Sequence, residues 1–389
     1  MPLHRDYPHL SFQRKWELNN RCQFMLGECN ALLKAISNTP ILPSYYDELM
    51  RVALRKGAQS TTAIEGNTLT DEQIARLLEG KKLPESIEYQ GIEVQNIIEA
   101  FNAILRETVY ENQEQLITPD LLKRFHKMVG KNLGHHFAAV PGQFRNSDVV
   151  VGRYRCPDYR DVPELIDKYC AFLRNTFQYQ QGNNNNFADT FIEAIVAHVY
   201  LEWIHPFGDG NGRTGRLVEF YVLSRGAYPD ITLHILSNFY NATRPEYYRQ
   251  LDEAGKTGDL SAFIEYALLG FRDGLYQTLE TIQTNKLHIT WQKYVYEKFD
   301  TVKSRQKDVF KRQRTFALEV PIDREFTLGS IPDLNIQLAK LYSNISVKTL
   351  ERDVNDLVQL DILKEKDGKY FANIATLSKM VAKRKRVAE

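Results

Sequence analysis

The feature that most constrains the fold is a run of apolar residues that ends in a loop rich in glycine. From about Asp189 to Ile204 the residues are apolar on nearly every side, which predicts a helix buried in a core. The loop that follows, HPFGDGNGRTGR at 205–216, contains four glycines, and helical apolar spacing resumes from Arg216. The sequence therefore predicts a buried helix, a short loop and the start of a second helix.

Helix-start signals mark the chain before this loop. Ser44 with Asp47 three residues later resembles a capping box that opens a helix, and Thr70 with Gln73 does the same. These two signals predict two short helices on either side of the segment STTAIEGN at residues 60–67.

The rest of the first three quarters of the chain is mostly helical in pattern. Residues 89–107 carry an apolar stripe at helical spacing, and the Thr-Pro pair at 118–119 marks another helix start. A small hairpin is expected within 140–155, turning at the Asn-Ser-Asp segment 146–148. The polar tract at 181–187 is expected to be a surface loop. The expected fold class is mostly α, with one small β-hairpin in this part.

Composition and charge narrow the class of protein. Fifty basic residues against 49 acidic ones give a net charge of +1, so no global field draws the chain to nucleic acid or to a membrane. A length of 389 residues predicts two or three domains, at roughly 150 residues per domain. The four cysteines form no CxxC pair, there is no signal-like segment, and no apolar run approaches about 18 residues. We expect a cytoplasmic protein with free thiols and no membrane partner.

The loop at 205–216 combines groups that bind and transfer phosphate. A glycine-rich loop that enters a helix offers unpaired backbone N–H groups and the positive end of the helix dipole. Arg213 and Arg216 lie three residues apart at that helix start, and their guanidinium groups suit the oxygens of a polyphosphate. Asp209 is a hard oxygen ligand for Mg²⁺, and His205 is a base near neutral pH. These residues predict a site for nucleotide phosphoryl transfer.

The same stretch resembles the signature of the Fic family, HPFx(D/E)GNGRxxR, and matches it at every specified position. The resemblance implies that AMP is transferred from ATP to a Ser, Thr or Tyr hydroxyl of a protein and that pyrophosphate is released. It implies that His205 is the base, that Asp209 holds Mg²⁺, and that Arg216 reaches the γ-phosphate. The residues of this loop implied to bind the nucleotide are Gly210, Asn211, Gly212, Arg213, Thr214, Gly215 and Arg216.

A second stretch resembles the inhibitory pattern of the family, (S/T)xxxE(G/N). It runs from Thr61 to Gly66, which predicts an inhibitory helix near residues 57–66. By this resemblance Glu65 pairs with Arg216, occupies the position of the γ-phosphate and keeps the resting enzyme autoinhibited. The alternative is that Glu65 is a solvated helix residue before a glycine that ends the helix.

Two further segments resemble parts of the family that contact substrates. The hairpin near 142–152 resembles the flap that binds an extended target segment by strand addition. Its candidate contacts are Val149, Val150 and Val151, which could instead form the core of the hairpin. Residues 241–251 resemble the segment that closes over the nucleotide. The candidates for the adenosine side there are Tyr247, Tyr248 and Leu251, and the two tyrosines could instead be core aromatics.

A second histidine lies on the helix that precedes the loop. His198 is seven residues before His205 on the same helical face, which raises the question of a metal pair. No third ligand follows at zinc spacing, so we expect His198 to be a hydrogen-bonded core residue.

The last hundred residues differ in pattern. Residues 286–315 are charged and rich in aromatic residues, with an apolar stripe that predicts one linking helix. After residue 316 the expected order is a helix, a turn near 343–344, a helix capped by Ser346, and a hairpin turned at 367–368. That order resembles a winged helix.

The charges of this region do not select DNA as its partner. In the second helix of the expected winged helix, which should be basic in a DNA reader, Lys348 and Arg352 are offset by acidic residues. These residues are Glu351, Asp353 and Asp356. The tail at 379–386 is basic and could touch a phosphate backbone, although such runs are usually solvated. Contact with a protein is at least as well supported as contact with DNA.

These predictions give four segments and two functional hypotheses. The segments are an N-terminal helical region at 1–115, a catalytic core at 116–280, a linking helix at 281–315 and a winged helix at 316–389. The first hypothesis is an AMP-transferring enzyme whose partners are ATP, Mg²⁺ and a target protein that the sequence does not identify. The second is a DNA-associated regulator that uses the core as a nucleotide sensor. His205 favours the enzyme, because a sensor needs no base. A homodimer, the reverse reaction and a nucleotide other than ATP stay open.

Overall fold

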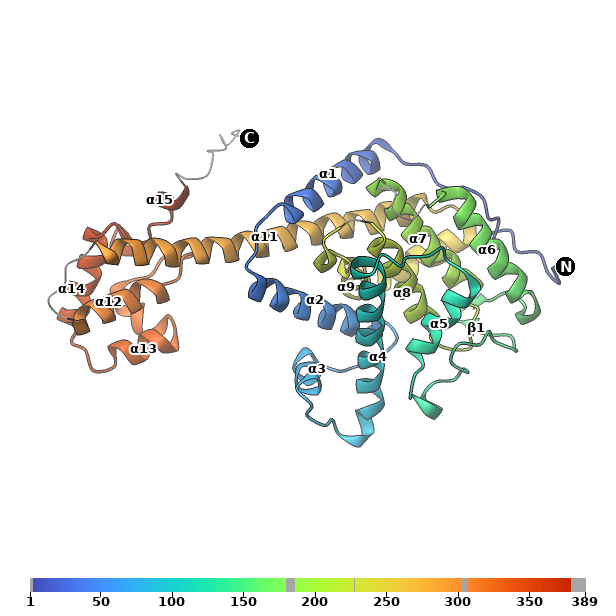
Figure 1. The fold of residues 1–389 in the computed structure, drawn as a ribbon, viewed down its shortest axis with the longest axis horizontal. Helices are drawn as coiled ribbons and strands as arrows, with labels where there is room; N and C mark the ends of the chain where they lie inside the picture. Colours follow the sequence, from blue (N-terminus) through green and yellow to red (C-terminus); the bar gives the residue numbers. More distant parts are fainter. Residues whose placement is uncertain (1–2, 180–185, 227, 302–306, 379–389) are drawn as a thin grey trace. The chain divides into compact units, whose positions relative to one another are not determined.

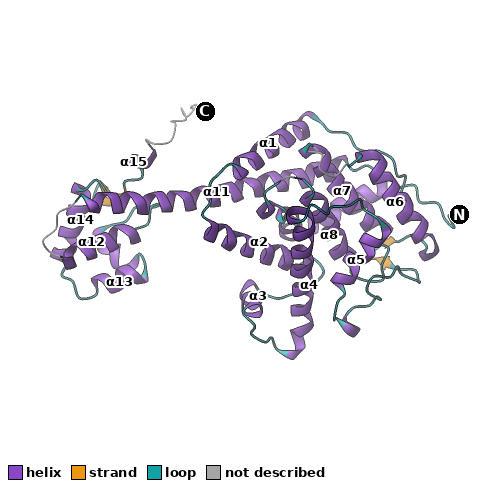
Figure 2. Ribbon diagram, viewed as in Figure 1, coloured by secondary structure: helices purple, strands orange, loops and turns teal. Residues whose placement is uncertain are grey.

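The computed structural model is mostly helical, with two short β-hairpins (Figures 1 and 2). It describes residues 3–179, 186–226, 228–301 and 307–378. Contacts along the chain divide it into two compact units, Met1–Leu279 and Glu280–Glu389. Most of the polar tract expected to be a loop, and the basic tail, lie outside the described residues.

The first unit is built around two adjacent helices, α7 and α8. Helix α7 is buried along almost its whole length, as its apolar sequence predicts, and α8 packs along it. Helices α4 and α5 pack against α8, and α6 packs against α7 (Figure 1). The bounds are α1 Asn20–Ser37, α2 Pro43–Ala63, α3 Asp71–Leu78, α4 Glu88–Leu105, α5 Pro119–Val129, α6 Val162–Phe177, α7 Phe187–Ile204, α8 Asn211–Ser224, α9 Ile235–Ala242 and α10 Arg244–Thr257.

The helix caps before the glycine loop are partly as predicted. The capping box of Thr70 and Gln73 opens α3, and the Thr118 side chain caps α5. The capping box predicted at Ser44 is wrong, because α2 begins at Pro43 and has no side-chain cap. Proline needs no such cap, since its fixed φ suits the first turn of a helix and it lacks an N–H to satisfy.

Of the two short helices expected around residues 60–67, the one after the segment is confirmed as α3, and the one before it is a wrong prediction. Helix α2 is 21 residues long and includes the Ser-Thr-Thr-Ala part of that segment in its last turn. Only residues 64–66 form a turn, and α3 begins later, at Asp71. The segment predicted to be inhibitory is therefore the end of a long helix, and its position depends on how α2 packs against α4 and α9.

Helix α8 begins five residues earlier than its apolar spacing predicts, at Asn211 instead of Arg216. Gly210 is the residue before the helix and has a left-handed backbone, with φ of 74°. Gly215 lies inside the helix, where a Cβ atom would be 2.5 Å from a carboxylate oxygen of Glu202 on α7. Glycine lowers helix propensity, but here it allows the close approach of two helices. This packing outweighs the low propensity and keeps residues 211–215 in α8.

The hairpin exists, but its turn is not where the sequence predicts it. Strand β1, Val150–Val151, pairs antiparallel with β2, Tyr154–Arg155. The turn is made by the two residues between them, where Gly152 has φ of 58°. Residues 146–148 form a bend before the hairpin instead. The side chain of buried Arg145 holds this bend by donating to the carbonyls of Ser147 and Pro157.

The second unit contains the predicted helices and hairpin of the C-terminal region. The linking helix predicted at 286–315 is wrong, because α11 starts much earlier and ends at Asp300, and a separate helix starts at Lys307. Ser346 caps α14, and Asp367 and Gly368 turn the hairpin with positive φ angles, as predicted. The bounds are α11 Ser261–Asp300, α12 Lys307–Glu319, α13 Ile336–Tyr342, α14 Val347–Gln359, β3 Leu363–Lys366, β4 Lys369–Ala372 and α15 Ala375–Ser378. A core of apolar side chains from α11, α12, α13 and α14 holds this unit together.

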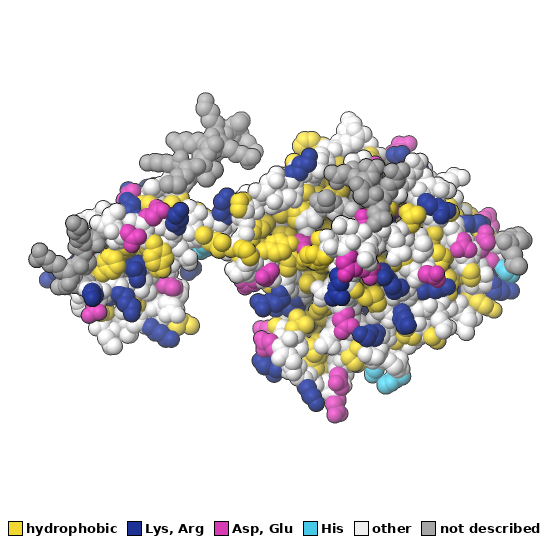
Figure 3. All heavy atoms as spheres, in the orientation of Figure 1, with side chains coloured by type: hydrophobic (Ala, Val, Ile, Leu, Met, Phe, Trp, Pro, Cys, Tyr) yellow, Lys and Arg dark blue, Asp and Glu magenta, His cyan; other side chains and the backbone are white. Residues whose placement is uncertain are grey.

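Surface charge and cysteine state agree with the composition. Basic and acidic side chains are interspersed over the face shown in Figure 3. All four cysteines are free thiols, as predicted. In the part of the chain that the structure describes, no helix is both long enough and apolar enough to cross a bilayer.

Candidate functional site

His205 follows the last residue of α7 directly, in a left-handed backbone conformation with φ of 49° and ψ of 59°. Its carbonyl accepts a hydrogen bond of 2.8 Å from Nε of Arg145, and its Nδ1 lies 3.3 Å from the carbonyl oxygen of Glu202. Burial lowers the pKa of His205 to about 4, so the ring is neutral at pH 7. A proton on Nδ1 satisfies the contact with Glu202 and leaves Nε2 free to accept a proton.

The loop after His205 is held in place by the side chain of its own Asn211 and by His126 of α5. The Asn211 amide accepts from the N–H of Phe207 at 2.9 Å and donates to its carbonyl at 2.8 Å. His126 of α5 stacks on the Phe207 ring and lies 2.9 Å from the carbonyl of Asp209. The Asn211 amide therefore holds the loop, and its implied role in cradling phosphate stays a prediction.

Asp209 and Arg213 form an ion-pair network with a residue that sequence reasoning missed. Arg213 donates to Asp209 at 3.0 Å and to Glu93 of α4 at 2.5 Å. The other oxygen of Asp209 accepts from the N–H of Ala138 at 3.0 Å. Glu93 gave no signal of its own, because a glutamate on a helix is usually solvated and its partner is 120 residues away. Arg213 is thus engaged by two carboxylates in this arrangement.

The residues present fit a magnesium ion whose shell is completed by phosphate. Among the described residues, no group of three or more His, Cys, Asp or Glu side chains could hold a metal by itself. Asp209 is partly exposed and lies beside the first turn of α8. Mg²⁺ typically takes one or two carboxylates and fills its remaining positions with phosphate oxygens and water. A single carboxylate beside an anion site is the ligand set for such an ion.

Glu65 and Arg216 form the ion pair that the sequence predicts. Arg216 Nη2 donates to a Glu65 carboxylate oxygen at 2.5 Å and to the carbonyl of Thr61 at 2.9 Å. Burial opposes ionisation of Glu65, but the charge and hydrogen bond of Arg216 outweigh it and hold its pKa below the usual value. Arg216 is 1% exposed, and its Nε has no partner among the described residues. The alternative of a merely solvated Glu65 is wrong.

The chain geometry around Glu65 explains how its carboxylate reaches Arg216. Gly66 lies in the turn after α2 with φ of 101°, and the N–H of Asn67 donates back to the carbonyl of Thr62 at 3.2 Å. A Cβ atom at Gly212 would collide with the Glu65 carboxylate. Glycine at 212 is therefore what allows this carboxylate to lie against the first turn of α8.

A cavity of about 490 Å³ connects these residues. Glu65, Arg216 and His205 line it together with Gly212, and this volume is within the range of small-molecule sites. The other lining residues come from three places, which are the hairpin (Val151, Gly152, Arg153 and Tyr154), the end of α7 (Glu202 and Trp203) and α10 (Tyr247, Tyr248, Leu251, Asp252, Gly255 and Lys256). The structure brings the predicted base, the anion site and the inhibitory carboxylate into one cavity.

Not every residue implied to bind the nucleotide lines this cavity. Thr214 is fully buried and donates to the carbonyl of Gly210, and Gly215 contacts α7, so their binding roles stay predictions. Gly210 and Arg213 also lie outside the cavity wall. The helical period explains the difference, since Gly212 and Arg216 are four residues apart and share the face of α8 that is open to the cavity.

The two tyrosines of α10 differ in their surroundings. Tyr247 is buried and its hydroxyl lies 2.9 Å from Nε2 of His198, which is itself a hydrogen-bonded core residue, as predicted. Tyr248 is 44% exposed and donates to the carbonyl of Ile64 at 3.0 Å. Tyr247 is therefore a core aromatic that also forms part of the wall, and Leu251 lines the cavity beside Tyr248.

The valines of the hairpin also divide into two groups. Val150 and Val151 are 63% and 45% exposed, and β1 pairs only with β2 among the described residues. Val149 is partly buried, and its carbonyl accepts from the N–H of Cys156 at 3.3 Å. Val150 and Val151 are therefore the exposed valines of the hairpin, and Val149 is engaged in it through its carbonyl. Contact of any of the three with a target segment stays a prediction.

Sequence reasoning missed other residues that shape the cavity. Glu202 and Trp203 line it just before His205, and Tyr154 holds the hairpin against them by donating to the carbonyl of Trp203 at 2.7 Å. A signal for Glu202 was present, because a carboxyl group within an almost wholly apolar helix needs a reason. Burial raises the pKa of Glu202 to about 8.

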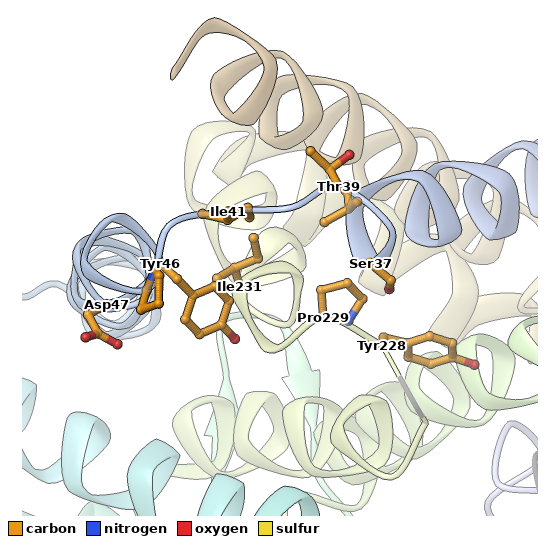
Figure 4. Close-up of a pocket in the computed structure, with 10 residues that line it drawn as sticks. Ser37, Thr39, Ile41, Tyr46, Asp47, Tyr228, Pro229 and Ile231 are labelled. Atoms are coloured by element: carbon orange, nitrogen blue, oxygen red, sulfur yellow. The ribbon is translucent and has the colours of Figure 1, made fainter. Parts of the chain in front are cut away.

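A second pocket lies apart from these residues. It has a volume of about 570 Å³ and is formed by the end of α1, the linker to α2 and the segment at 228–231 (Figure 4). Its walls are mostly apolar and aromatic, with Asp47 as the charged residue among them. No basic side chain lines it, so it does not suit a polyphosphate, and the cavity at His205 is the candidate site.

Comparison with known proteins agrees with this placement. Residues 116–223 match the model of the Fic/DOC family. The chain is 30% identical over 212 residues to the protein adenylyltransferase fic-1 of Caenorhabditis elegans and 31% identical over 212 residues to the protein adenylyltransferase Fic of Drosophila mojavensis. Each match covers 53% of this chain and 37% of the relative, so the chain spans much less than the whole of these relatives.

Solved structures show the same fold. A Fic family protein from Desulfovibrio desulfuricans superposes with a TM-score of 0.56 over 92% of this chain and 98% of that chain, at 19% identity. Residues 134–508 of Fic-1 from C. elegans give a TM-score of 0.51 over 68% of this chain and 73% of that chain, at 24% identity. At these identities the likeness supports the fold, and activity has to be argued from the site.

Proposed function

We propose, from the premise that residues 116–223 form a Fic domain, that the protein is an autoinhibited protein adenylyltransferase. It transfers AMP from ATP to a Ser, Thr or Tyr hydroxyl of a target protein or of the chain itself. One observation carries the proposal. His205, Arg216 and Glu65 line a single cavity, and Glu65 is bonded to Arg216. A base, an anion site and a removable competitor for that site are the parts that a regulated phosphoryl transfer needs.

The reaction uses His205 as the general base. Nε2 of His205 accepts the proton of the target hydroxyl, whose oxygen forms a bond to the α-phosphorus of ATP. The bond from the α-phosphorus to the bridging oxygen breaks, and pyrophosphate leaves on the opposite side. Asp209 would hold Mg²⁺, which supplies charge stabilisation at the phosphates. The backbone at Gly212 and the N-terminus of α8 face the negative charge that the phosphates bring.

Inhibition follows from competition for Arg216. The Glu65 carboxylate is bonded where the guanidinium would bind the γ-phosphate, and its charge repels a polyphosphate. When Glu65 moves away, both Nη2 and the unpartnered Nε of Arg216 are open to phosphate oxygens. The target segment is expected to add to the hairpin beside Val150 and Val151, which places its hydroxyl near His205.

The experiment is transfer of label from α-³²P ATP with Mg²⁺ to protein in a cell lysate, with UTP and CTP in parallel. Three proteins are compared: the wild type, Glu65→Gly, and Glu65→Gly with His205→Ala. We expect strong labelling only by Glu65→Gly with ATP, and a loss of about 10²- to 10⁴-fold when the base is removed. Binding of ATP should survive in the double variant, because the base acts in the transition state.

A different result would favour the second hypothesis. If ATP binds and no variant labels any protein, the core is a nucleotide sensor, and binding of duplex DNA at low salt would then be the next measurement. Among the described residues of the second unit, Lys364 and Lys369 on the hairpin are paired with Asp361 and Glu325, which weakens the case for DNA. The enzyme remains the proposal that the site supports.

A further inference from the structure

The end of the inhibitory helix is held by side chains from another helix. Arg244 Nη1 donates to the carbonyl of Ala63 at 3.2 Å, and the Tyr248 hydroxyl donates to the carbonyl of Ile64 at 3.0 Å. Both side chains belong to the first two turns of α10. With the bond from Arg216 to Thr61, three side chains bind carbonyl groups within the four residues before Glu65.

These contacts are made at the C-terminal end of α2, where backbone carbonyl groups can accept from side-chain donors. The last carbonyl groups of a helix have no partner within the helix, and they carry its negative dipole end. The Ala63 carbonyl also accepts from the N–H of Gly66 at 3.0 Å, so the Arg244 guanidinium adds a second donor and a positive charge at this dipole end. Glu65 follows Ile64 directly, so fixing the carbonyl of Ile64 also fixes the backbone from which the Glu65 side chain extends.

The carboxylate of Glu65 has little else to hold it. Among the described residues, Arg216 is its one hydrogen-bond donor, and a third of its side chain is exposed. Arg216 is buried, but the Glu65 side chain is one-third exposed and can turn into the cavity, which limits what its single hydrogen bond contributes. The inhibitory geometry therefore depends on the backbone position of residues 61–65 as well as on the ion pair.

We propose that Arg244 and Tyr248 form a latch that positions Glu65 for inhibition, an inference that rests on the proposed function. They are positioning residues, since they act through the backbone of α2. The two side chains support each other, because the Arg244 guanidinium lies over the Tyr248 ring at 5.8 Å. Loss of the latch lets the end of α2 move and frees Arg216 for the nucleotide.

The latch is coupled to the cavity through Tyr248. This residue lines the cavity and donates to Ile64 at the same time, while Arg244 does not line the cavity. A ligand that displaces the Tyr248 hydroxyl would loosen the hold on Ile64. Arg244 is thus the residue at which the latch can be tested without changing the wall of the site.

The test compares Arg244→Ala with Arg249→Ala as a matched control. Arg249 lies on the same helix, is exposed, and is bonded to Glu246 one turn away. Each variant is made in the wild-type protein and in Glu65→Gly, and AMP transfer from labelled ATP is measured. We expect Arg244→Ala to raise transfer by the wild-type protein at least about fivefold, the loss of roughly one hydrogen bond, and Arg244→Lys to restore part of the inhibition. In Glu65→Gly, Arg244→Ala should change nothing, because the residue that the latch positions is absent.

A second measurement tests the latch without relying on AMP transfer. Amide hydrogen exchange over residues 60–67 should become at least about fivefold faster in Arg244→Ala and stay unchanged in Arg249→Ala. If Glu65→Gly transfers AMP but Arg244→Ala changes neither transfer by the wild-type protein nor amide exchange, the latch is overturned. The proposed function would then still stand. Absence of transfer in Glu65→Gly, with the change in exchange still present, would instead overturn the proposed function alone. Equal activation by Arg244→Ala in both backgrounds would mean that Arg244 acts on something other than Glu65, which also overturns the latch.

Discussion

Each unit of the protein contains an arginine paired with a carboxylate, but the two pairs are built in opposite ways. In the first unit Arg216 is buried and Glu65 is one-third exposed. In the second unit Asp353 is 1% exposed, and Arg312 is the more open partner. Asp353 accepts from Arg312 at 2.6 and 3.1 Å, from Gln313 at 2.9 Å and from Tyr342 at 3.1 Å.

The difference shows in which pair another anion can replace the carboxylate on the arginine. Asp353 is buried and fully hydrogen-bonded, so removing it leaves a guanidinium, an amide and a hydroxyl without partners. Glu65 lies at the edge of a cavity with one hydrogen bond, so an incoming phosphate can take its place on Arg216. A buried cation with an open carboxylate suits regulation, and a buried carboxylate with a complete set of donors suits stability.

The largest expected effect tests this difference directly. Asp353→Ala should reduce the free energy of unfolding of the second unit by about 3–5 kcal/mol, because it breaks a buried, hydrogen-bonded ion pair. Glu65→Ala should reduce that of the first unit by less, because Arg216 borders a cavity in which water can replace the lost carboxylate. Urea unfolding reports both units, since Trp291 lies in the second unit and the other two tryptophans, Trp16 and Trp203, lie in the first. Equal losses from the two substitutions would contradict the comparison.

The next effect concerns pH and is expected in the first unit. The histidines whose pKa burial lowers to about 3 or 4 are His126, His198, His205 and His234. As the pH falls below 6.5, the unfolded chain binds protons at these sites and the folded chain does not, so stability falls toward pH 4. Burial also raises the pKa of Glu202 and Glu219 to about 8, so their protons are held only by the folded chain above pH 6.5. Stability therefore also falls as the pH rises toward 8.

We expect the first unit to be most stable near pH 6.5. Four histidines against two glutamates give a net difference of about two protons between pH 6 and 5, which corresponds to a loss of about 2–3 kcal/mol per pH unit. The second unit has one histidine, His288, and should respond less in this range. The midpoints of urea unfolding at pH 5, 6.5 and 8, determined separately for the two units, measure how the stability of each unit depends on pH. A shift of the same size in both units would show that surface charge governs the response instead.

The third effect is on ligand affinity. Glu65→Ala should raise the affinity for ATP with Mg²⁺ at least about tenfold, because it frees Arg216 for a charge-assisted hydrogen bond and removes a like charge. Asp353→Ala provides the control, since its carboxylate belongs to the other unit and should leave ATP affinity unchanged. Titration calorimetry gives both values. Unchanged affinity in Glu65→Ala would mean that the ion pair does not compete with the nucleotide.

The smallest expected effect concerns helix caps near the inhibitory segment. Thr70→Ala should destabilise the first unit by about 1 kcal/mol, because it removes the cap of α3. Ser44→Ala should have an effect below about 0.5 kcal/mol, since Ser44 caps nothing in α2. Thermal unfolding of the two variants distinguishes them. A larger loss of stability in Ser44→Ala than in Thr70→Ala would show that Ser44 caps α2, as the sequence predicts.

The sequence predicted those parts of the site that are close together along the chain. His205, Asp209 and Arg216 lie within one loop and the first turns of one helix, so their order alone implied a base, a magnesium ligand and an anion site. The caps at Thr70 and Thr118 and the turn at Asp367 were predictable for the same reason, since each depends on bonds within a few residues.

Several features near the site were not predictable in this way. The start of α8 at Asn211 and the turn of the hairpin at Gly152 were placed wrongly, because glycine and asparagine fit several backbone conformations that the local sequence does not distinguish. Packing between α7 and α8 and the bonds of Arg145 decide between them.

By itself, the sequence determined which chemical groups the site contains, because the loop at 205–216 holds most of them in one short segment. The family resemblance implied that Arg216 pairs with Glu65, 151 residues away, and only the tertiary structure decided the other partners. Arg213 is bound by Glu93 across a separation of 120 residues. The hold of Arg244 on Ala63 spans 181 residues. Such pairs depend on which helices pack together, and no local pattern encodes that choice, since any exposed carboxylate has the same chemistry until folding brings one of them to the arginine.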